Sequence, residues 1–531
     1  MSLAGFSPAR LRVFASSKVR RIAAGLAASA SDRTGGTTLV IWFATAHALL
    51  WTEILTKLKA AQDIHFDVAE AFAWGRKFQL GYGKHPPLSG WVAGLWFQLF
   101  PAANWATYAL AMTTVSVGLV VCWLVALRVV DRRRAFFVVV MLALYPIFNF
   151  KGFKYNPDLL QLVTLPLLVL AYLNAFEKRT ALAGVWLGLA GALALLTKYW
   201  VLTMIGAIGI AALLHPERRA FLRSPAPWVA IATLVVAVAP HLWWLKQVDF
   251  APLIYAGDVY ALTDRSECLR LVLGYIGHNL ALSAAPVILA ALTLVWRHPL
   301  TPARAWARGA NHGVNRSQAL NVWITQIVVA IGPPLGALAF MIYLKTDWGI
   351  PLFFLVPLAL IAVPGLRLPK IALFDLTMIW LAITLAVLVA APEIASREMA
   401  GYPNSASGYS ARSELARELT EAWHQRFGSR WAVVAGATEI GEPMTFYSPD
   451  HPATYTPNEI WSSGLTSLDE ARRLGFIGIC DTTDERLAAC EKWMAANAGG
   501  AENLVMTTQR FFQGHAGPST AWKVYIVPPG K

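Results

Sequence analysis

The side chains best suited to acid–base chemistry lie in one polar stretch near the N-terminus, between two long apolar segments. Asp67 and Glu70 are three residues apart, so on a helix both carboxylates lie on one face together with Trp74. Carboxylates gathered at a membrane surface raise the pKa of at least one of them, which favours a general base. The alternative interpretation is a solvated acidic face that only caps or orients the loop.

A glycine- and proline-rich turn follows these acids, with the sequence Gly-Tyr-Gly-Lys-His-Pro-Pro at residues 81–87. Glycine lets the backbone approach a ligand, and the prolines fix the exit of the turn. Lys84 and His85 offer cationic donors suited to a phosphate, and Tyr82 is a candidate substrate contact beside them. The alternative is an ordinary rigid turn that leads back into the membrane.

Further candidate residues lie where apolar segments meet polar loops. Lys198 interrupts a continuous apolar stretch, which makes it a candidate phosphate ligand, although snorkelling to the membrane interface is the alternative. Asn156 and Asp158 either cap the following segment or contact sugar hydroxyls. Arg265, at the end of a later loop, is a further candidate for the phosphate. Trp348 suits an interfacial position and is also considered as a substrate contact.

The composition indicates which elements position these residues. The chain has 531 residues, of which 56% are hydrophobic and only 14% are charged, and its mean hydropathy is +0.49. These values predict a polytopic α-helical membrane protein. The net charge of +14 does not indicate nucleic-acid binding, because the basic residues sit mainly in short loops between apolar runs.

About eleven apolar segments approach the length of roughly 20 residues that a membrane-spanning helix needs. They lie near residues 37–56, 104–129, 135–149, 158–176, 181–197, 199–214, 226–245, 270–296, 319–343, 349–364 and 371–391. Basic residues concentrate in the loops on one side, which places residues 1–36 inside as a basic cytoplasmic tail. The acid-rich loop 57–103 and residues 392–531 then lie outside. Residues 37–391 form the predicted transmembrane catalytic domain.

Residues 392–531 have the composition of a soluble α/β domain. Helices are expected at 410–427, 469–474 and 484–496, and strands at 431–435, 476–479, 503–508 and 522–527. Cys480 and Cys490 could form a disulfide if this domain lies outside the cytoplasm, and two unpaired thiols are the alternative.

These residues resemble a known family. The pattern Asp67-x-x-Glu70-Ala71-x-x-Trp74, followed by the turn at 81–87, is similar to the bacterial relatives of dolichyl-phosphate-mannose protein mannosyltransferases. That group belongs to the GT-C superfamily and includes the lipid A aminoarabinose and galacturonic acid transferases. Asn156-Pro157-Asp158 and Thr197-Lys198-Tyr199 also resemble family positions, and the similarity covers about residues 40–370.

The resemblance implies an inverting glycosyltransferase of the bacterial inner membrane with its active site on the periplasmic face. A sugar would move from a polyprenyl-phosphate donor to a hydroxyl of an envelope lipid, glycan or protein. Asp67 would take the acceptor proton, Glu70 would position the acceptor or Lys84, and Lys84, His85 and Lys198 would stabilise the leaving phosphate. Tyr199 would contact substrate. No catalytic metal or other cofactor is expected, with a divalent metal as the open alternative.

One motif of the superfamily is missing. The oligosaccharyltransferase branch carries a WWDYG motif, whereas this chain has only Thr-Asp-Trp-Gly at 346–349. Transfer of a preassembled oligosaccharide to asparagine is therefore not expected. A transporter or flippase of a lipid or sugar is the alternative function, but it should place charges near the bilayer midplane rather than at the outer ends of the segments. An envelope-binding protein is a third, weaker alternative.

Overall fold

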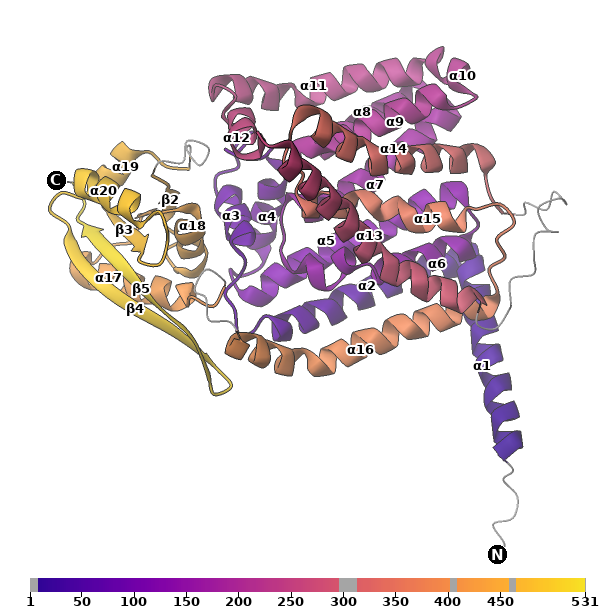
Figure 1. The fold of residues 1–531 in the computed structure, drawn as a ribbon, viewed down its shortest axis with the longest axis horizontal. Helices are drawn as coiled ribbons and strands as arrows, with labels where there is room; N and C mark the ends of the chain where they lie inside the picture. Colours follow the sequence, from indigo (N-terminus) through magenta and orange to yellow (C-terminus); the bar gives the residue numbers. More distant parts are fainter. Residues whose placement is uncertain (1–7, 296–312, 402–407, 458–464, 531) are drawn as a thin grey trace, which may run out of the picture.

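The computed structural model describes residues 8–295, 313–401, 408–457 and 465–530. They form a helical bundle followed by a smaller α/β domain at one end of it (Figure 1). Within these ranges, seven helices are long and apolar enough to cross a membrane. They are α2 (Arg33–Leu58), α5 (Asn104–Val129), α7 (Pro157–Lys178), α11 (Pro225–Gln247), α13 (Arg265–Val295), α14 (Arg316–Phe340) and α16 (Lys370–Gly401).

Shorter helical elements account for the remaining apolar segments. The segment predicted at 135–149 is split into α6 (Arg132–Ala143) and the 3-10 turns η1 (Pro146–Phe148) and η2 (Phe150–Phe153). The segments predicted at 181–197 and 199–214 are α8 (Ala181–Leu195), then η3 (Tyr199–Val201) and α9 (Leu202–Leu214). Proline begins η1 and also follows the first residue of η5 (Ile350–Leu355) and α15 (Val356–Ile361), because proline fixes φ and is tolerated in a first turn.

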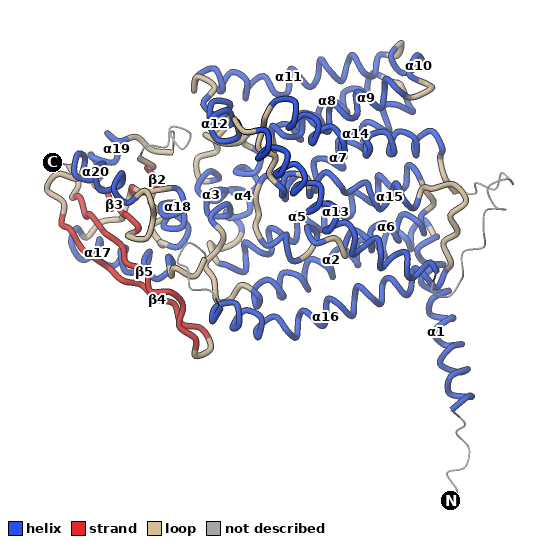
Figure 2. The backbone as a smooth tube through the Cα atoms, in the orientation of Figure 1, coloured by secondary structure: helices blue, strands red, loops and turns tan. Residues whose placement is uncertain are grey.

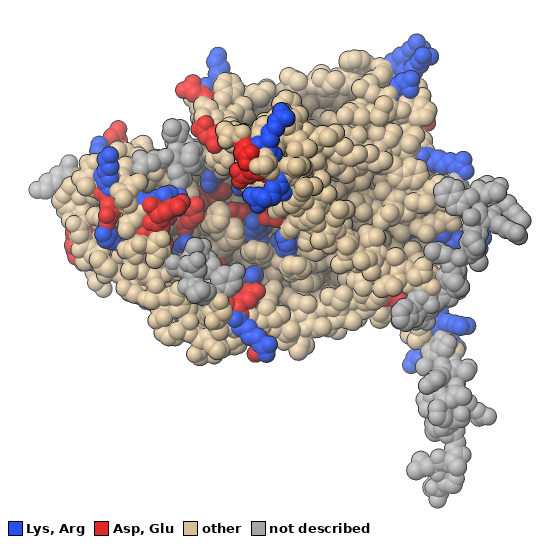
Figure 3. All heavy atoms as spheres, in the orientation of Figure 1, with Lys and Arg blue, Asp and Glu red and all other residues tan. Residues whose placement is uncertain are grey.

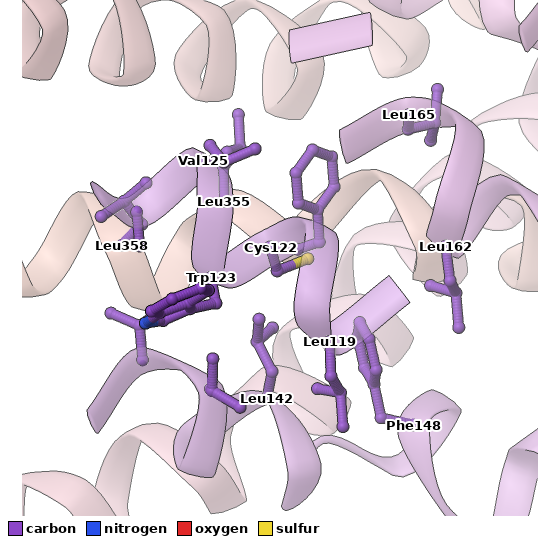
Figure 4. Packing of buried hydrophobic residues seen from close by; sticks show 14 of the residues in the cluster. Leu119, Cys122, Trp123, Val125, Leu142, Phe148, Leu162, Leu165, Leu355 and Leu358 are labelled. Carbon is purple, nitrogen blue, oxygen red and sulfur yellow. The ribbon is translucent and has the colours of Figure 1, made fainter. Parts of the chain in front are cut away.

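The bundle has a buried centre and an apolar perimeter. In the most apolar windows of α5 and α7, 72% and 78% of the residues are buried, against 22% in α11 and in α13. Side chains of α5, α6, α7 and α15 gather in this centre, as Figure 4 shows for Cys122, Leu142, Leu162 and Leu358. The perimeter helices expose large apolar side chains, which suits contact with lipid rather than water.

The N-terminal segment is helical. Helix α1 (Pro8–Ser31) extends away from the bundle in Figure 1. Helix α1 packs against α16, and Ala27 and Ala30 near the C-terminal end of α1 are buried. Asp32 then accepts a hydrogen bond from the Gly35 backbone N–H at 2.7 Å and caps α2. Part of the segment interpreted as a tail is therefore an ordered helix.

The acid-rich loop contains two short helices that cross closely. Helices α3 (Phe66–Gly75) and α4 (Leu88–Leu99) meet at two glycines. A Cβ atom on Gly75 would lie 2.4 Å from the Gly94 backbone nitrogen, and one on Gly94 would lie 2.4 Å from the Gly75 oxygen. Leu95 and Leu99 on α4 are exposed, as expected for a helix that lies in the membrane interface. This crossing fixes the direction in which α3 presents its acids.

The C-terminal domain is a five-stranded mixed sheet with the order β2-β1-β3-β5-β4. Its strands are β1 (Val433–Ala435), β2 (Ala453–Tyr455), β3 (Phe476–Asp481), β4 (Glu502–Phe512) and β5 (His515–Val527). The first three are parallel to one another, and β5 is antiparallel to β3 and β4. Figure 2 shows the named strands in this domain, with the β4–β5 hairpin as the longest pair.

Helices cover both faces of this sheet. One face packs on α17 (Arg412–Phe427) and α18 (Thr438–Tyr447), and the other packs on α19 (Leu468–Leu474) and α20 (Leu487–Asn497). The sequence did not predict α18 or β2, because Gly441 and Pro443 obscure the helical pattern and β2 has only three residues. Cys480 and Cys490 form a disulfide between β3 and α20.

A buried carboxylate joins this domain to the acid-rich loop at residues 57–103. Asp63 is 3% exposed and accepts hydrogen bonds from the Arg412 backbone N–H at 2.7 Å and from the Ser413 hydroxyl at 2.7 Å. The Arg510 guanidinium on β4 lies 2.9 Å from the same carboxylate. The Ile64 backbone N–H donates to the Tyr447 hydroxyl at 2.7 Å beside it. Asp63 therefore holds the two parts together, a role that the sequence did not indicate.

We expect Asp63→Ala to loosen this junction. The change leaves the largely buried Arg510 without its carboxylate, and breaking a buried ion pair costs about 3–5 kcal/mol. Hydrogen exchange of the purified protein should show faster exchange at residues 408–415 and 508–512 than in the wild type. Asp264→Asn is the matched control, because Asp264 is an exposed capping residue that asparagine can replace. Unchanged protection in Asp63→Ala would contradict the assigned role.

Candidate active site

Helix α3 carries both candidate acids and begins at a histidine cap. The Asp67 backbone N–H donates to His65 Nδ1 at 3.2 Å, so the imidazole satisfies one free N–H of the first turn. Asp67 Oδ2 accepts a hydrogen bond from Asn156 Nδ2 at 2.9 Å and lies 3.6 Å from Lys154 Nζ. Asn156 also caps α7, because its Oδ1 accepts from the Leu159 N–H. The N-terminus of α7 thus fixes the orientation of the Asp67 carboxylate.

These contacts keep Asp67 ionised. Burial by itself would raise the pKa of Asp67, but attraction to His65 and Lys154 and the hydrogen bond from Asn156 outweigh it and lower the pKa to about 2. The raised pKa lies instead at Glu70, mainly because of its burial and to a smaller extent because of the charges of Asp67 and Glu439, which act against the effect of Lys84. At neutral pH Asp67 is a carboxylate that can accept a proton.

Glu70 forms the central ion pair of the loop. Lys84 Nζ lies 2.9 Å from Glu70 Oε1, and both side chains are largely buried. A second acid, Glu442 of α18, is 1% exposed, and its charge acts on the same ammonium group. Burial would lower the pKa of Lys84, but Glu70 and Glu442 together raise it, so Lys84 remains charged. The soluble domain thus contributes a charge to this site.

The turn that carries Lys84 is held by aromatic packing. Tyr82 stacks on Trp74 with ring centroids 4.9 Å apart, and its hydroxyl donates to the Trp74 carbonyl at 2.8 Å. A Cβ atom on Gly81 would lie 2.3 Å from the Trp244 ring, so a glycine is required at that position. Tyr82 is 2% exposed and therefore supports the turn; its hydroxyl is already engaged.

His85 is buried next to the lysines. Burial lowers its pKa, and the charges of Lys198 and Lys84 lower it further, to about 3. The imidazole is therefore neutral at physiological pH. It provides a hydrogen-bonding group rather than the second cation that the sequence suggested.

The second ion pair of the site contains Lys198, whose charge also acts on His85. Lys198 Nζ donates to Asp158 Oδ1 at 2.6 Å and lies 5.2 Å from the centroid of the Trp348 ring. Trp348 also contacts the rings of Trp200 and Tyr260, at centroid distances of 4.9 and 4.8 Å. Trp348 thus borders the site as part of an aromatic cluster.

Two predicted residues lie apart from these ion pairs. The Tyr199 hydroxyl faces His241 Nε2 at 3.0 Å, and His241 Nδ1 lies 2.7 Å from the Leu80 carbonyl, which indicates a supporting role. Arg265 begins α13, is exposed, and forms no ion pair with the acids of the site. Asp67, Glu70, Lys84, His85, Asn156, Asp158 and Lys198 are brought together by contacts or by mutual electrostatic influence.

Three charged residues of this site were missing from the candidates. Lys154 pairs with Asp67, Lys345 acts on His85 and Lys198, and Glu442 acts on Lys84. The only signal for Lys154 was its place beside the Asn-Pro-Asp cap, and Glu442 had none because α18 was not expected. In the described ranges, no three His, Cys, Asp or Glu side chains converge as a metal site.

Residues 84–244 match the sequence model of a family described as dolichyl-phosphate-mannose-protein mannosyltransferase. The predicted family resemblance is confirmed. The matched range begins at Lys84 and includes Asn156, Asp158 and Lys198, whereas Asp67 and Glu70 precede it.

Two curated proteins that this chain resembles come from Rhizobium johnstonii. The chain is 25% identical over 260 residues to the lipid A galacturonosyltransferase RgtD and 23% identical over 322 residues to the lipopolysaccharide core galacturonosyltransferase RgtB. The alignments cover 47% and 60% of this chain. They span only 52% and 63% of the relatives, less than two thirds of either length.

A solved structure has the same fold. ArnT from Cupriavidus metallidurans, crystallised with undecaprenyl phosphate, superimposes with a TM-score of 0.57 at 13% identity and covers 92% of this chain and 98% of its own. The chain is therefore a polytopic helical membrane protein with the fold of ArnT and a C-terminal α/β domain. At this identity the similarity establishes the fold, while the chemistry must be argued from the side chains.

Proposed function

We propose that this protein is an inverting glycosyltransferase that moves a sugar from a polyprenyl-phosphate donor to a hydroxyl group of a cell-envelope acceptor. The observation that carries the proposal is one short helix with two acids beside cations: Asp67 lies 3.6 Å from Lys154 Nζ, and Glu70 lies 2.9 Å from the buried Lys84. The names of the two curated relatives, and the undecaprenyl phosphate bound to the structural neighbour, support the same reaction class.

The proposed reaction needs one base and several cations. The acceptor oxygen forms a bond to the anomeric carbon as the bond from that carbon to the lipid phosphate breaks, and Asp67 takes the acceptor proton. The leaving polyprenyl phosphate is already an anion, so it requires cations rather than a protonating acid. Lys84, Lys154 and Lys198 can supply these cations, and His85 can contribute a neutral hydrogen bond.

The resting ion pairs indicate how donor binding could activate the base. Lys154 and Lys84 both lower the pKa of Asp67. A phosphate that shares these cations adds negative charge and weakens their effect, so the pKa of Asp67 rises toward a value that suits a base. In this proposal Glu70 orients Lys84 rather than accepting the proton.

The distribution of charge supports a periplasmic active site in a bacterial inner membrane. Asp and Glu gather on the side of the C-terminal domain in Figure 3, whereas the opposite end of the bundle shows mainly Lys and Arg. That basic end includes the starts of α6 and of α10 (Arg218–Leu222). By the positive-inside rule, this distribution supports a cytoplasmic N-terminus and a periplasmic position for residues 408–530. Arg297, Arg304 and Arg308, which contributed to the predicted basic side, lie outside the described residues.

Analysis of envelope lipids tests the proposed reaction directly. In a strain lacking the gene, mass spectrometry of lipid A, core oligosaccharide and membrane glycans should show one sugar missing, and the intact gene should restore it. If the purified protein moves a polyprenyl-phosphate sugar across the membrane of vesicles and forms no glycosylated acceptor, the flippase alternative would be favoured instead. The charges at one end of the spans do not favour that alternative.

We expect the transfer rate to be insensitive to His85 titration between pH 5 and 8. An unperturbed histidine changes charge near pH 6.5, but the pKa of His85 is lowered to about 3, so the imidazole is neutral throughout this range. The wild type and His85→Gln should therefore have pH–rate profiles of the same shape. A limb near pH 6.5 that is present in the wild type and absent in His85→Gln would contradict this expectation.

A further inference from the structure

A charged cavity lies between the end of α3 and the C-terminal domain, outside the ion pairs described above. It has a volume of about 290 Å³ and lies between the end of α3 and residues around β1, α18 and β2. Arg76, Lys77 and Arg430 border it, with Thr445 and His451 nearby. Its volume is close to the lower end of the range for small-molecule sites, which suits one charged sugar unit.

The cations around this cavity outnumber the acids. Glu470 is the one carboxylate in the lining, and it already accepts a hydrogen bond from the Thr466 hydroxyl at 2.8 Å. The nearby Asp450 carboxylate is engaged by the Trp431 N–H at 2.7 Å and by His424 Nε2 at 2.7 Å. No carboxylate of the described residues forms an ion pair with Arg76, Lys77 or Arg430.

These cations also act on one another. Arg76 remains exposed, and its partial burial together with the charge of Arg430 lowers its pKa. Burial likewise lowers the pKa of His451, with additional contributions from Arg76 and Arg430. Arg430 is held in place because its Nε–H donates to the Asp450 carbonyl at 2.7 Å. An anion in this cavity would relieve the repulsion between the two arginines without moving the backbone.

The position of the cavity relates it to the acids of α3. Ala73, which lines the cavity, follows Glu70 by three residues and therefore lies on the same face of the helix. Arg76 is a further three residues along, so its backbone lies about 9 Å from that of Glu70 at the rise of an α-helix. A short glycan could therefore reach from the cavity to the site of Asp67.

We infer that this cavity binds an anionic group of the acceptor, which is a sugar-linked phosphate or carboxylate. The hydroxyl group of the same acceptor that receives the sugar then lies at Asp67. The identification of the ligand as the acceptor rests on the proposed function, whereas the anion site itself does not depend on glycosyl transfer. It assigns the C-terminal domain a direct part in choosing the substrate, through Arg430 from one side and Arg76 from the other.

Binding of simple probes tests the anion site. Glucose 1-phosphate, glucuronate and glucose are titrated into the full chain in nanodiscs, and calorimetry is combined with hydrogen exchange. We expect one of the two anionic sugars to bind more tightly than glucose and to protect residues 72–78 and 445–454 from hydrogen exchange. Tighter binding of glucose 1-phosphate would identify a phosphate ligand, and tighter binding of glucuronate would identify a carboxylate ligand. The double variant Arg76→Gln/Arg430→Gln should weaken that binding about tenfold or more.

Two controls make the result specific. Lys492→Gln removes an exposed cation on α20, away from the cavity lining, and should leave binding unchanged. Lys84→Met/Glu70→Gln, which removes both members of the buried pair at the other site, should also keep the protection at 445–454. Equal affinity for the anionic sugars in the wild type and the double arginine variant, or protection confined to residues 80–87, would overturn the inference.

Transfer assays separate this inference from the proposed function. If the reaction is confirmed, Arg76→Gln/Arg430→Gln should raise KM for a charged acceptor and leave KM for the uncharged analogue unchanged. Equal effects on both acceptors would overturn the anion site while the transferase remains. If the wild type transfers no sugar to any acceptor, the proposed function is rejected. Binding of the anionic probes at residues 445–454 would still support the anion site in that case.

Discussion

Asp67→Asn should lower the rate of sugar transfer by about 10² to 10⁴-fold, the contribution typical of a positioned general base. Asparagine has the shape of aspartate and can still accept the hydrogen bond from Asn156, but it cannot take the acceptor proton. The measurement is single-turnover transfer of labelled sugar from a polyprenyl-phosphate donor in isolated membranes. Donor affinity should be retained or should rise, because a negative charge beside Lys154 is removed.

The control for this variant is Asp249→Asn. Asp249 is exposed and has a backbone φ of 49°, a region that asparagine tolerates well. The control should transfer sugar at the wild-type rate. Full activity in Asp67→Asn would show that another group accepts the proton, and Glu70 would then be the next candidate because its pKa is raised.

Lys84→Met should lower kcat/KM for the donor by about 10² to 10³-fold, comparable to the loss of one preorganised donor at a developing anion. Lys84 is the cationic member of the buried pair with Glu70. Methionine keeps about the same side-chain volume and removes the positive charge. Titration of undecaprenyl phosphate into the purified variant should show weaker binding. The same titration in Lys57→Met, which alters an exposed lysine on α2, should match the wild type.

A folding defect must be separated from loss of the donor site. Lys84→Met leaves Glu70 buried without its cation, which destabilises a protein more than removing both members of such a pair. Lys84→Met/Glu70→Gln should therefore regain much of the thermal stability of the wild type and still bind the donor lipid weakly. If the double variant regains donor binding as well, Lys84 acts on the fold and not on the phosphate.

The sequence predicts what depends on local patterns. The spacing of Asp67 and Glu70 predicts a shared helix face, and both lie on α3. The apolar segments predict the long helices, because length and hydropathy are local properties. The break after α6 was not predicted, since the apolar residues continue while Pro146 starts a separate 3-10 turn.

Contacts between distant residues could not be predicted in this way. Asn156 binds Asp67 across 89 positions, and Arg510 pairs with Asp63 across 447 positions. No periodic pattern within either segment encodes such a pairing, because it depends on how α7 and β4 pack against the loop. The charge of Asp67 also depends on these partners, so its low pKa could not be predicted from the spacing of acids.

The proximity of Glu442 to Lys84 has a consequence for exchanging parts between related proteins. Helix α18 packs directly on α3, and its Phe446 ring lies 5.1 Å from the Phe72 ring. A chimaera that combines this bundle with the C-terminal domain of a relative therefore changes the surface of that domain. It also changes the acid that acts on Lys84, the proposed ligand of the donor phosphate. Donor affinity in such chimaeras should depend on the residue at position 442, and restoring glutamate there should restore it.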